Sequence, residues 1–97
     1  MRKVTAAAIG FVSIAAAAVV SAEPPAGAAA CSGCHPSSPR GASPVARLAG
    51  RDRAEIVKAM QDFRSGARAG TVMDRIAKGF TDDEIQAIAA WYSKQKD

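Results

Sequence analysis

The chain has little cysteine and histidine: Cys31 and Cys34 are its only cysteines and His35 is its only histidine. A structural zinc site uses four Cys or His ligands, so these three residues do not complete one. A thioredoxin-like dithiol is a second interpretation of the C-x-x-C spacing, but that motif belongs to a longer chain with a βαβ pattern. This sequence has no strand pattern, which argues against a thioredoxin-like fold.

Long apolar runs are absent except at the N-terminus. Arg2 and Lys3 form a charged start, an apolar run follows from Val4 to Val20, and Val20-Ser21-Ala22 is a small-residue cleavage pattern. We therefore expect residues 1–22 to be a secretory signal peptide and residues 23–97 to be one domain. An uncleaved anchor is the alternative, but the run is short and alanine-rich for a membrane span. No stable membrane insertion is expected after cleavage.

The net charge of residues 23–97 is small, because 11 basic residues stand against 9 acidic ones. Aromatic residues make up only 5% of the chain and are not interleaved with basic ones, so no nucleic-acid partner is expected. The sequence contains no flavin-binding motif and no convincing acid, base or nucleophile. We therefore do not expect the chain to be a catalyst alone.

The same region has few large apolar residues, a thin core for an autonomous domain. Chains of this size usually need a metal or a cross-link in addition to the core. The large apolar residues are Val45, Leu48, Ile56, Val57, Met60, Phe63, Val72, Met73, Ile76, Phe80, Ile85, Ile88, Trp91 and Tyr92.

The five residues from Cys31 to His35 read Cys-Ser-Gly-Cys-His, which is the C-x-x-C-H attachment pattern for a c-type haem. The two thiols can form thioethers with the vinyl groups of one porphyrin, and the adjacent imidazole can reach the iron. Chance occurrence is the alternative, and the export signal and a candidate second ligand argue against it. A covalently held porphyrin would also supply the missing apolar bulk.

The rest of the domain is expected to be short helices and loops. Ala26 to Cys34 can form one helix that delivers the cysteines, with small residues for a crossing helix at Gly27, Ala28 and Ala30. Residues 36–50 read as an ordered loop over the proximal side of the ring, with Leu48 touching it.

Three helical segments are expected after this loop. Asp52 is the expected N-cap of a helix over residues 53–64, which ends at Ser65-Gly66. Residues 72–78 could form one or two turns closed by Gly79. Thr81 with Glu84 predicts a capping box at the start of the last helix, and Phe80 with Ile85 predicts a hydrophobic staple. An inward stripe is predicted at Ile85, Ile88, Ala89 and Tyr92, with Trp91 beside it, and we expect this face to pack against the N-terminal helix.

The second axial ligand of a His-bound haem iron tunes its potential, and a methionine thioether suits electron transfer. Met60 lies on the apolar stripe of a helix, where methionine is ordinarily packing. Met73 follows a Gly-rich stretch, where a loop position can bring its sulfur under the ring. We therefore predict Met73 as the distal ligand, with Met60 or an open iron site as alternatives.

The segment Thr71 to Phe80, Thr-Val-Met-Asp-Arg-Ile-Ala-Lys-Gly-Phe, is preceded by Phe63-Arg64-Ser65-Gly66 and by Leu48-Ala49-Gly50. With these motifs the chain resembles the small monohaem cytochrome subunit of flavocytochrome c sulfide dehydrogenase, a class I cytochrome c. The resemblance covers about residues 29–92. One departure is Ala46, where relatives commonly have proline, so the sequence leaves the carbonyl that orients the His35 ring unassigned.

This resemblance implies an all-α class I cytochrome c fold, with three to five short helices around one covalently attached haem c. It implies thioethers at Cys31 and Cys34, His35 as proximal ligand and Met73 as distal ligand. It further implies a periplasmic protein that accepts electrons from an FAD-bearing flavoprotein subunit which oxidises sulfide. The chain would then be the electron-transfer subunit of a sulfide-oxidising oxidoreductase.

The competing hypothesis is a free monohaem electron shuttle between periplasmic redox proteins. Apolar exposed residues around the haem edge would favour a committed complex, and a uniformly charged rim would favour a shuttle. Basic residues near the expected haem could be an ordinary solvated surface, or could together pair with propionates or steer an acidic partner. They are Arg40, Arg47, Arg51, Arg53, Arg64, Arg68, Arg75 and Lys78, with Arg47 and Arg75 the first candidates.

Overall fold

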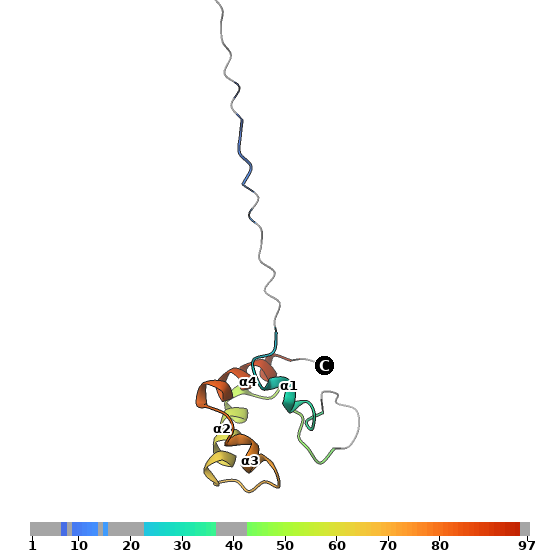
Figure 1. Cartoon of the computed structure of the whole chain (residues 1–97). Coiled ribbons are helices and arrows are strands. Elements are labelled where there is room, and N and C mark those ends of the chain that lie inside the picture. Colours follow the sequence, from blue (N-terminus) through green and yellow to red (C-terminus); the bar gives the residue numbers. More distant parts are fainter. Residues whose placement is uncertain (1–6, 8, 14, 16–22, 37–42, 96–97) are drawn as a thin grey trace, which may run out of the picture.

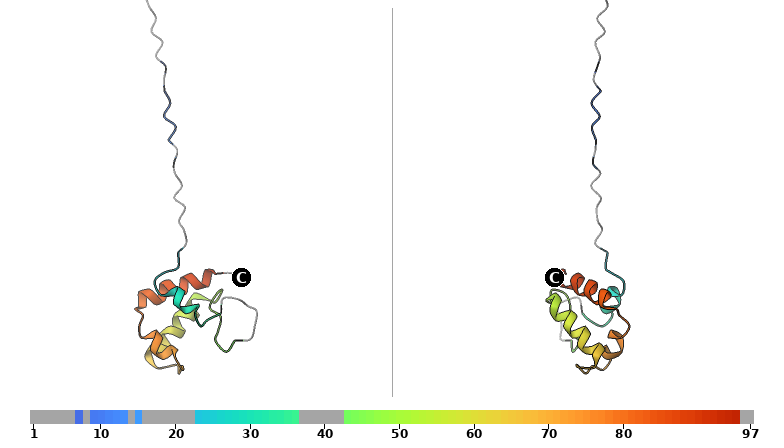
Figure 2. Two further views of the ribbon diagram at one scale, coloured as in Figure 1. Left: turned by 45° about the vertical axis from the view of Figure 1, so that its right-hand side comes forward. Right: turned by 90° about the vertical axis from the view of Figure 1, so that its left-hand side faces the viewer.

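The computed structural model describes residues 7, 9–13, 15, 23–36 and 43–95. The helices are α1 (Ala28–Cys31), α2 (Arg53–Ser65), α3 (Met73–Ala77) and α4 (Asp82–Lys94) (Figure 1). The described part of the chain contains no strand, and the predicted all-α class with three to five short helices is confirmed. Helix α2 packs against both α3 and α4, while α1 lies beside α4 in each view (Figure 2).

Most of the predicted signal peptide lies outside the described residues. Positions 7, 9–13 and 15 are exposed and form no helix. Within the ranges that the structure describes, no helix has the length and apolar character needed to cross a bilayer. Residues 37–42 of the predicted proximal loop, including Arg40, also fall outside the described ranges.

Helix α1 is shorter than the predicted helix over residues 26–34. It begins after Gly27, whose φ of 84° is left-handed and cannot continue a right-handed helix. It ends at Cys31, and Ser32 to Cys34 continue as turns. Ala28 is buried and Gly27 lies against Phe80 and Ile88, as predicted for small residues at a crossing, whereas Ala30 is exposed.

The predicted ends of α2 and the predicted start of α4 are confirmed. The Asp52 carboxylate accepts hydrogen bonds from the backbone N–H groups of Ala54 (2.9 Å) and Glu55 (3.2 Å). Gly66, with φ 84°, follows the last residue of α2. At α4, the Thr81 hydroxyl accepts from the Glu84 N–H (3.2 Å) and the Glu84 carboxylate accepts from the Thr81 N–H (3.0 Å), which completes the capping box.

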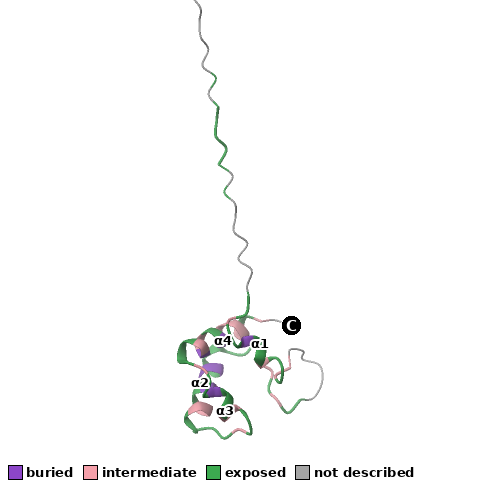
Figure 3. Cartoon of the chain, in the orientation of Figure 1, coloured by how far each residue is buried: buried purple, intermediate pink, exposed green. Residues whose placement is uncertain are grey.

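The core lies between α2, α3 and α4, where the buried residues gather (Figure 3). Its buried members are Ile56, Val57, Met60, Ala77, Ile85 and Ala89, with Phe63, Met73, Phe80 and Tyr92 packed against them. The predicted stripe of α4 is turned inward as expected, but most of it faces α2 and not, as predicted, the N-terminal helix. Contact with the N-terminal helix comes from Ile88, which lies near Gly27, and from Tyr92, which bonds Ala28.

Candidate functional site

The cysteines and the histidine are brought together where α1 ends. The Cys31 carbonyl accepts hydrogen bonds from the backbone N–H groups of Cys34 (3.2 Å) and His35 (2.9 Å). Cys31 is half-buried and Cys34 is exposed, and neither is in a disulfide. One helical end followed by one turn thus presents two unpaired sulfurs and an imidazole within five residues.

The His35 ring is oriented by the Ala46 backbone. Its Nδ1 lies within hydrogen-bond distance of the Ala46 carbonyl oxygen. A carbonyl can only accept, so Nδ1 carries the proton, and in the neutral ring the lone pair lies on Nε2. Such a bond is the usual way in which a protein fixes the tautomer of a metal-ligating histidine. The acceptor that the sequence left unassigned is therefore Ala46, which offers the carbonyl without a proline.

His35 lines a cavity of about 300 Å³. The other residues that line it are Pro24, Ala29, Ser32, Pro36, Leu48, Ala49, Trp91, Tyr92 and Gln95. They come from α1 and the residues on either side of it, from the loop before α2, and from the end of α4 and the residue after it. Leu48, which we predicted to touch the porphyrin ring, thus shares a cavity with His35.

Burial also affects the chemistry of Cys31. Desolvation raises the pKa of the Cys31 thiol above its ordinary value, against a smaller opposite effect of hydrogen bonding. The pKa of Tyr92 is raised as well, first by burial and then by the nearby Cys31. At neutral pH both groups are therefore held in their protonated, neutral forms.

Met73 is the first residue of α3, so the short helical segment predicted over residues 72–78 is confirmed, and Met73 does not lie in the loop that precedes it. The N–H groups of Arg75 and Ile76 bond the Val72 carbonyl and start the helix there. Met73 is half-buried and packs against the core, whereas Met60 is buried inside the core at 9% exposure. Met73 is not among the described residues that line the His35 cavity, so the structure does not bring the two predicted axial ligands to one cavity.

Several of the basic residues near the expected haem have contacts within the protein. Arg53 donates to the Gln86 side chain (3.0 Å), and the Arg68 guanidinium lies 4.8 Å from the centre of the Phe63 ring. Arg64 bonds the backbone and a carboxylate near the start of α4. Arg75 and Lys78 are exposed on α3 and just after it.

Sequence reasoning missed the groups that hold the site in place. The Ala46 carbonyl is a backbone group and carries no side-chain signal. Tyr92 was assigned to the inward stripe, but the role of its hydroxyl as a donor to Ala28 depends on the crossing of α1 and α4. The contacts of Arg64 join residues 16 and 18 positions apart, and no local pattern indicates them.

Comparison with curated proteins identifies several similar cytochromes. The cytochrome subunit of sulfide dehydrogenase from Chlorobaculum tepidum is 39% identical over 62 residues, which cover 64% of this chain and 56% of that protein. A thiosulfate dehydrogenase electron acceptor from Stutzerimonas stutzeri is 43% identical over 65 residues, covering 65% of this chain and 30% of that protein. Cytochrome c-554(548) from Halomonas halodenitrificans is 31% identical over 70 residues, covering 68% of this chain and 84% of that protein.

The chain spans only part of some of these relatives, namely 56% of the Chlorobaculum protein and 30% of the Stutzerimonas protein. It spans most of cytochrome c-554(548). No protein-family model matches the sequence.

The site fits the cofactor of these relatives. Both sulfurs are unpaired, and the His35 ring is held with Nε2 as its only available lone pair. In the described ranges no three His, Cys, Asp or Glu residues are grouped so that they could hold a metal ion without a porphyrin. A covalent haem c, attached at a C-x-x-C-H sequence, accounts for all three residues. The chain belongs to the cytochrome c family, and its described residues have the all-α arrangement expected of the class I type.

Proposed function

We propose that this protein carries a single haem c in the periplasm and accepts electrons from a flavoprotein subunit that oxidises sulfide. Residues 1–22 would be the export signal and residues 23–97 the mature cytochrome. Cys31 and Cys34 would form the thioethers, His35 would be the proximal ligand and Met73 the distal one. The bound haem supplies an iron that cycles between the ferrous and ferric states, and the protein supplies its attachment and ligands.

The observation that carries this proposal is the contact between His35 Nδ1 and the Ala46 carbonyl, two residues before Leu48. It fixes the ring within one turn of two unpaired thiols. This is the arrangement that a proximal ligand needs, because the bonded carbonyl holds the tautomer and raises the basicity of Nε2.

Packing favours Met73 over Met60 as the distal ligand. Met60 is buried beside Ile56 and Val57, and drawing its sulfur out of the core would leave a cavity there. Met73 lies at the rim of the core, and its half-buried side chain can turn outward at less cost. A thioether on the iron favours the ferrous state and suits an electron carrier.

The surface around Met73 supports a committed partner. Val72 is 55% exposed and Ile76 is 41% exposed, and both flank Met73 in the sequence. Apolar side chains of this kind are typical of the desolvated centre of a stable interface. The name of the Chlorobaculum relative, a cytochrome subunit of sulfide dehydrogenase, supports another subunit of such an enzyme as that partner. The resemblance found in the sequence implies that this subunit is a flavoprotein.

A free electron shuttle is the second candidate. The exposed cations Arg75 and Lys78 in the same region would suit brief, salt-sensitive encounters with acidic redox proteins. The name of the Stutzerimonas relative, an electron acceptor of thiosulfate dehydrogenase, also fits a carrier that receives electrons from a separate enzyme.

One experiment separates the two candidates: native pull-down of the tagged full chain, followed by flavin and haem analysis. A committed subunit brings down a flavoprotein in a fixed ratio to haem, and sulfide reduces the haem in the isolated complex. A monomer that carries haem but never co-purifies with flavin contradicts the complex and favours the shuttle.

The ligand assignment has its own test. Replacing Met73 by Ala should abolish the weak long-wavelength sulfur-to-iron charge-transfer band, lower the potential and open the ferric iron to imidazole. Met60→Leu is the matched control, because it removes a thioether from the core at nearly constant volume and should leave the band intact. Unchanged spectra in the Met73 variant would contradict the assignment.

A further inference from the structure

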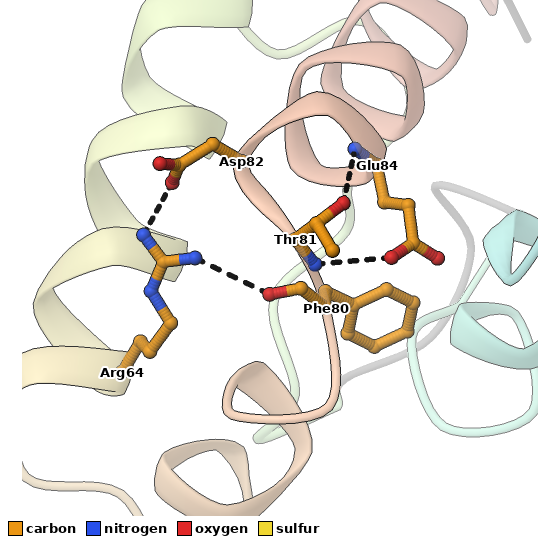
Figure 4. A network of polar contacts seen from close by, with 5 residues as sticks. All are labelled: Arg64, Phe80, Thr81, Asp82 and Glu84. Carbon is orange, nitrogen blue, oxygen red and sulfur yellow. Dashed lines mark hydrogen bonds and ion pairs between the residues drawn. The ribbon is translucent and has the colours of Figure 1, made fainter.

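Arg64, in the last turn of α2, makes a two-pronged contact with the start of α4 (Figure 4). Its Nη1 donates to the Phe80 carbonyl oxygen at 3.2 Å, and its Nη2 pairs with the Asp82 carboxylate. The Arg64 side chain is only 31% exposed, whereas that of Asp82 is 70% exposed. The planar guanidinium suits this geometry, because two of its N–H groups point in fixed directions to two acceptors.

These contacts join the two ends of one segment of the chain. Residues 66–79 leave α2 immediately after Arg64 and Ser65 and return to the core at Phe80. The segment contains α3 and therefore Met73. Arg64 thus closes the base of the segment with one side chain, in the way that a cross-link shortens a loop.

The backbone at Phe80, where the segment returns to the core, is also held by the capping box of α4. Thr81 follows Phe80, and its backbone N–H and hydroxyl are both used in the capping box with Glu84. Figure 4 shows the two sets of contacts on opposite sides of the Phe80 to Asp82 backbone. Arg64 connects this fixed junction to α2 through side-chain contacts.

Within the segment, contact with the core is uneven. Ala77 is fully buried, while Val72 and Ile76 are exposed and Met73 is half-buried. Gly70 lies so close to the Phe63 ring that a Cβ there would be 3.0 Å from Phe63 Cε1. The position of Met73 therefore depends on contacts on either side of it and on the closure at the base.

We propose that Arg64 is a positioning residue for Met73: by bonding Phe80 and Asp82 it closes the segment 66–79 and holds the thioether in place as an iron ligand. This inference rests on the proposed role of Met73. A soft thioether binds the harder ferric ion more weakly than it binds the ferrous ion. Loosening the segment should therefore appear first in the ferric protein, as easier displacement of Met73 by an external ligand.

The test uses the full-length ferric haem protein titrated with imidazole, with the sulfur-to-iron band recorded in parallel. Arg64→Met keeps the alkyl stem and removes both prongs. We expect it to raise the imidazole affinity about tenfold, the factor that corresponds to the loss of one charged hydrogen bond. Arg64→Lys keeps the charge without the fork and should lie between the wild type and Arg64→Met. Asp82→Asn tests the ionic prong at an exposed position if Arg64→Met does not fold.

Asp52→Ala is the control for a general loss of stability. It removes the cap at the opposite end of α2 and should cost a similar free energy of unfolding, yet change the imidazole affinity by no more than about twofold. The inference is overturned if Asp52→Ala raises the affinity as much as Arg64→Met does. It is also overturned if none of Arg64→Met, Arg64→Lys and Asp82→Asn changes the affinity.

Met73→Ala separates failure of this inference from failure of the proposed ligand. If Met73→Ala abolishes the band while the Arg64 and Asp82 variants behave like the wild type, Met73 remains the ligand and Arg64 does not position it. If Met73→Ala leaves the band unchanged, the ligand assignment fails and the inference about Arg64 fails with it.

Discussion

The Tyr92 hydroxyl donates a hydrogen bond to the Ala28 carbonyl oxygen at 2.5 Å, and this bond ties the end of α4 to the start of α1. Ala28 is fully buried, so water does not easily replace the donor. Three residues later α1 ends at Cys31, one of the two proposed attachment sites. The orientation of the turn proposed for haem attachment is therefore coupled to a side chain 64 positions away from Ala28.

Replacing Tyr92 by Phe should remove this bond while keeping the ring. We expect the free energy of unfolding of the haem protein to fall by about 1–2 kcal/mol, because the Ala28 carbonyl loses its donor in a buried place. Denaturant titration measures it. Ser93→Ala is the control, since it removes a hydroxyl of the same helix that bonds the Ala90 carbonyl of its own turn. An equal loss of unfolding free energy in both variants would mean that the bond between α4 and α1 stabilises the protein no more than a bond within one helix.

Replacing Gly27 by Ala tests the close approach of α1 to the core. Gly27 and Gly66 share a φ of 84°, so alanine at either position costs about 1–2 kcal/mol of backbone strain. At Gly27 the new Cβ would also lie 2.5 Å from Phe80 Cε1, whereas at Gly66 it would meet nothing within 4 Å. We expect Gly27→Ala to be the more destabilising by about 1–3 kcal/mol in denaturant titration. Equal losses would show that the Phe80 ring moves aside without cost.

Replacing Lys58 by Ala should have little effect, although Lys58 forms an ion pair with Asp62 in the next turn of α2. The Lys58 side chain is 75% exposed, and the lysine precedes the acid, which is the less favourable order on a helix. We expect the free energy of unfolding to change by less than about 0.5 kcal/mol. A larger loss at low salt that disappears at high salt would contradict this prediction.

The parts of the fold that the sequence predicted are those with local causes. The helices α2 and α4 follow from caps at Asp52 and Thr81, and each cap bonds a residue three positions later. The proposed attachment site is one contiguous motif, so its residues had to lie together. Local patterns of this kind hold in the folded chain because each is satisfied within a few residues.

The parts that the sequence did not predict depend on distant contacts. The start of α1 is set by the left-handed Gly27 beneath the Phe80 ring, and neither feature is visible from composition. The acceptor for His35 is the backbone of Ala46, 11 residues away.

The capping box of α4 predicts how stability depends on pH. The backbone N–H of Thr81, and next its hydroxyl, lower the pKa of Glu84 by hydrogen bonding. A carboxylate whose pKa is lower in the folded protein stabilises the fold above its unfolded pKa, and this stabilisation is lost as the pH falls through the folded value. Glu84→Gln should therefore be less stable than the wild type at neutral pH, and the difference should shrink on acidification in denaturant titrations at stepped pH. Glu55→Gln is the control, because Glu55 lies in the first turn of α2 and accepts no such bond from the N-cap of that helix. A difference between Glu84→Gln and the wild type that stays constant down to acid pH would show that the carboxylate charge contributes nothing to the cap.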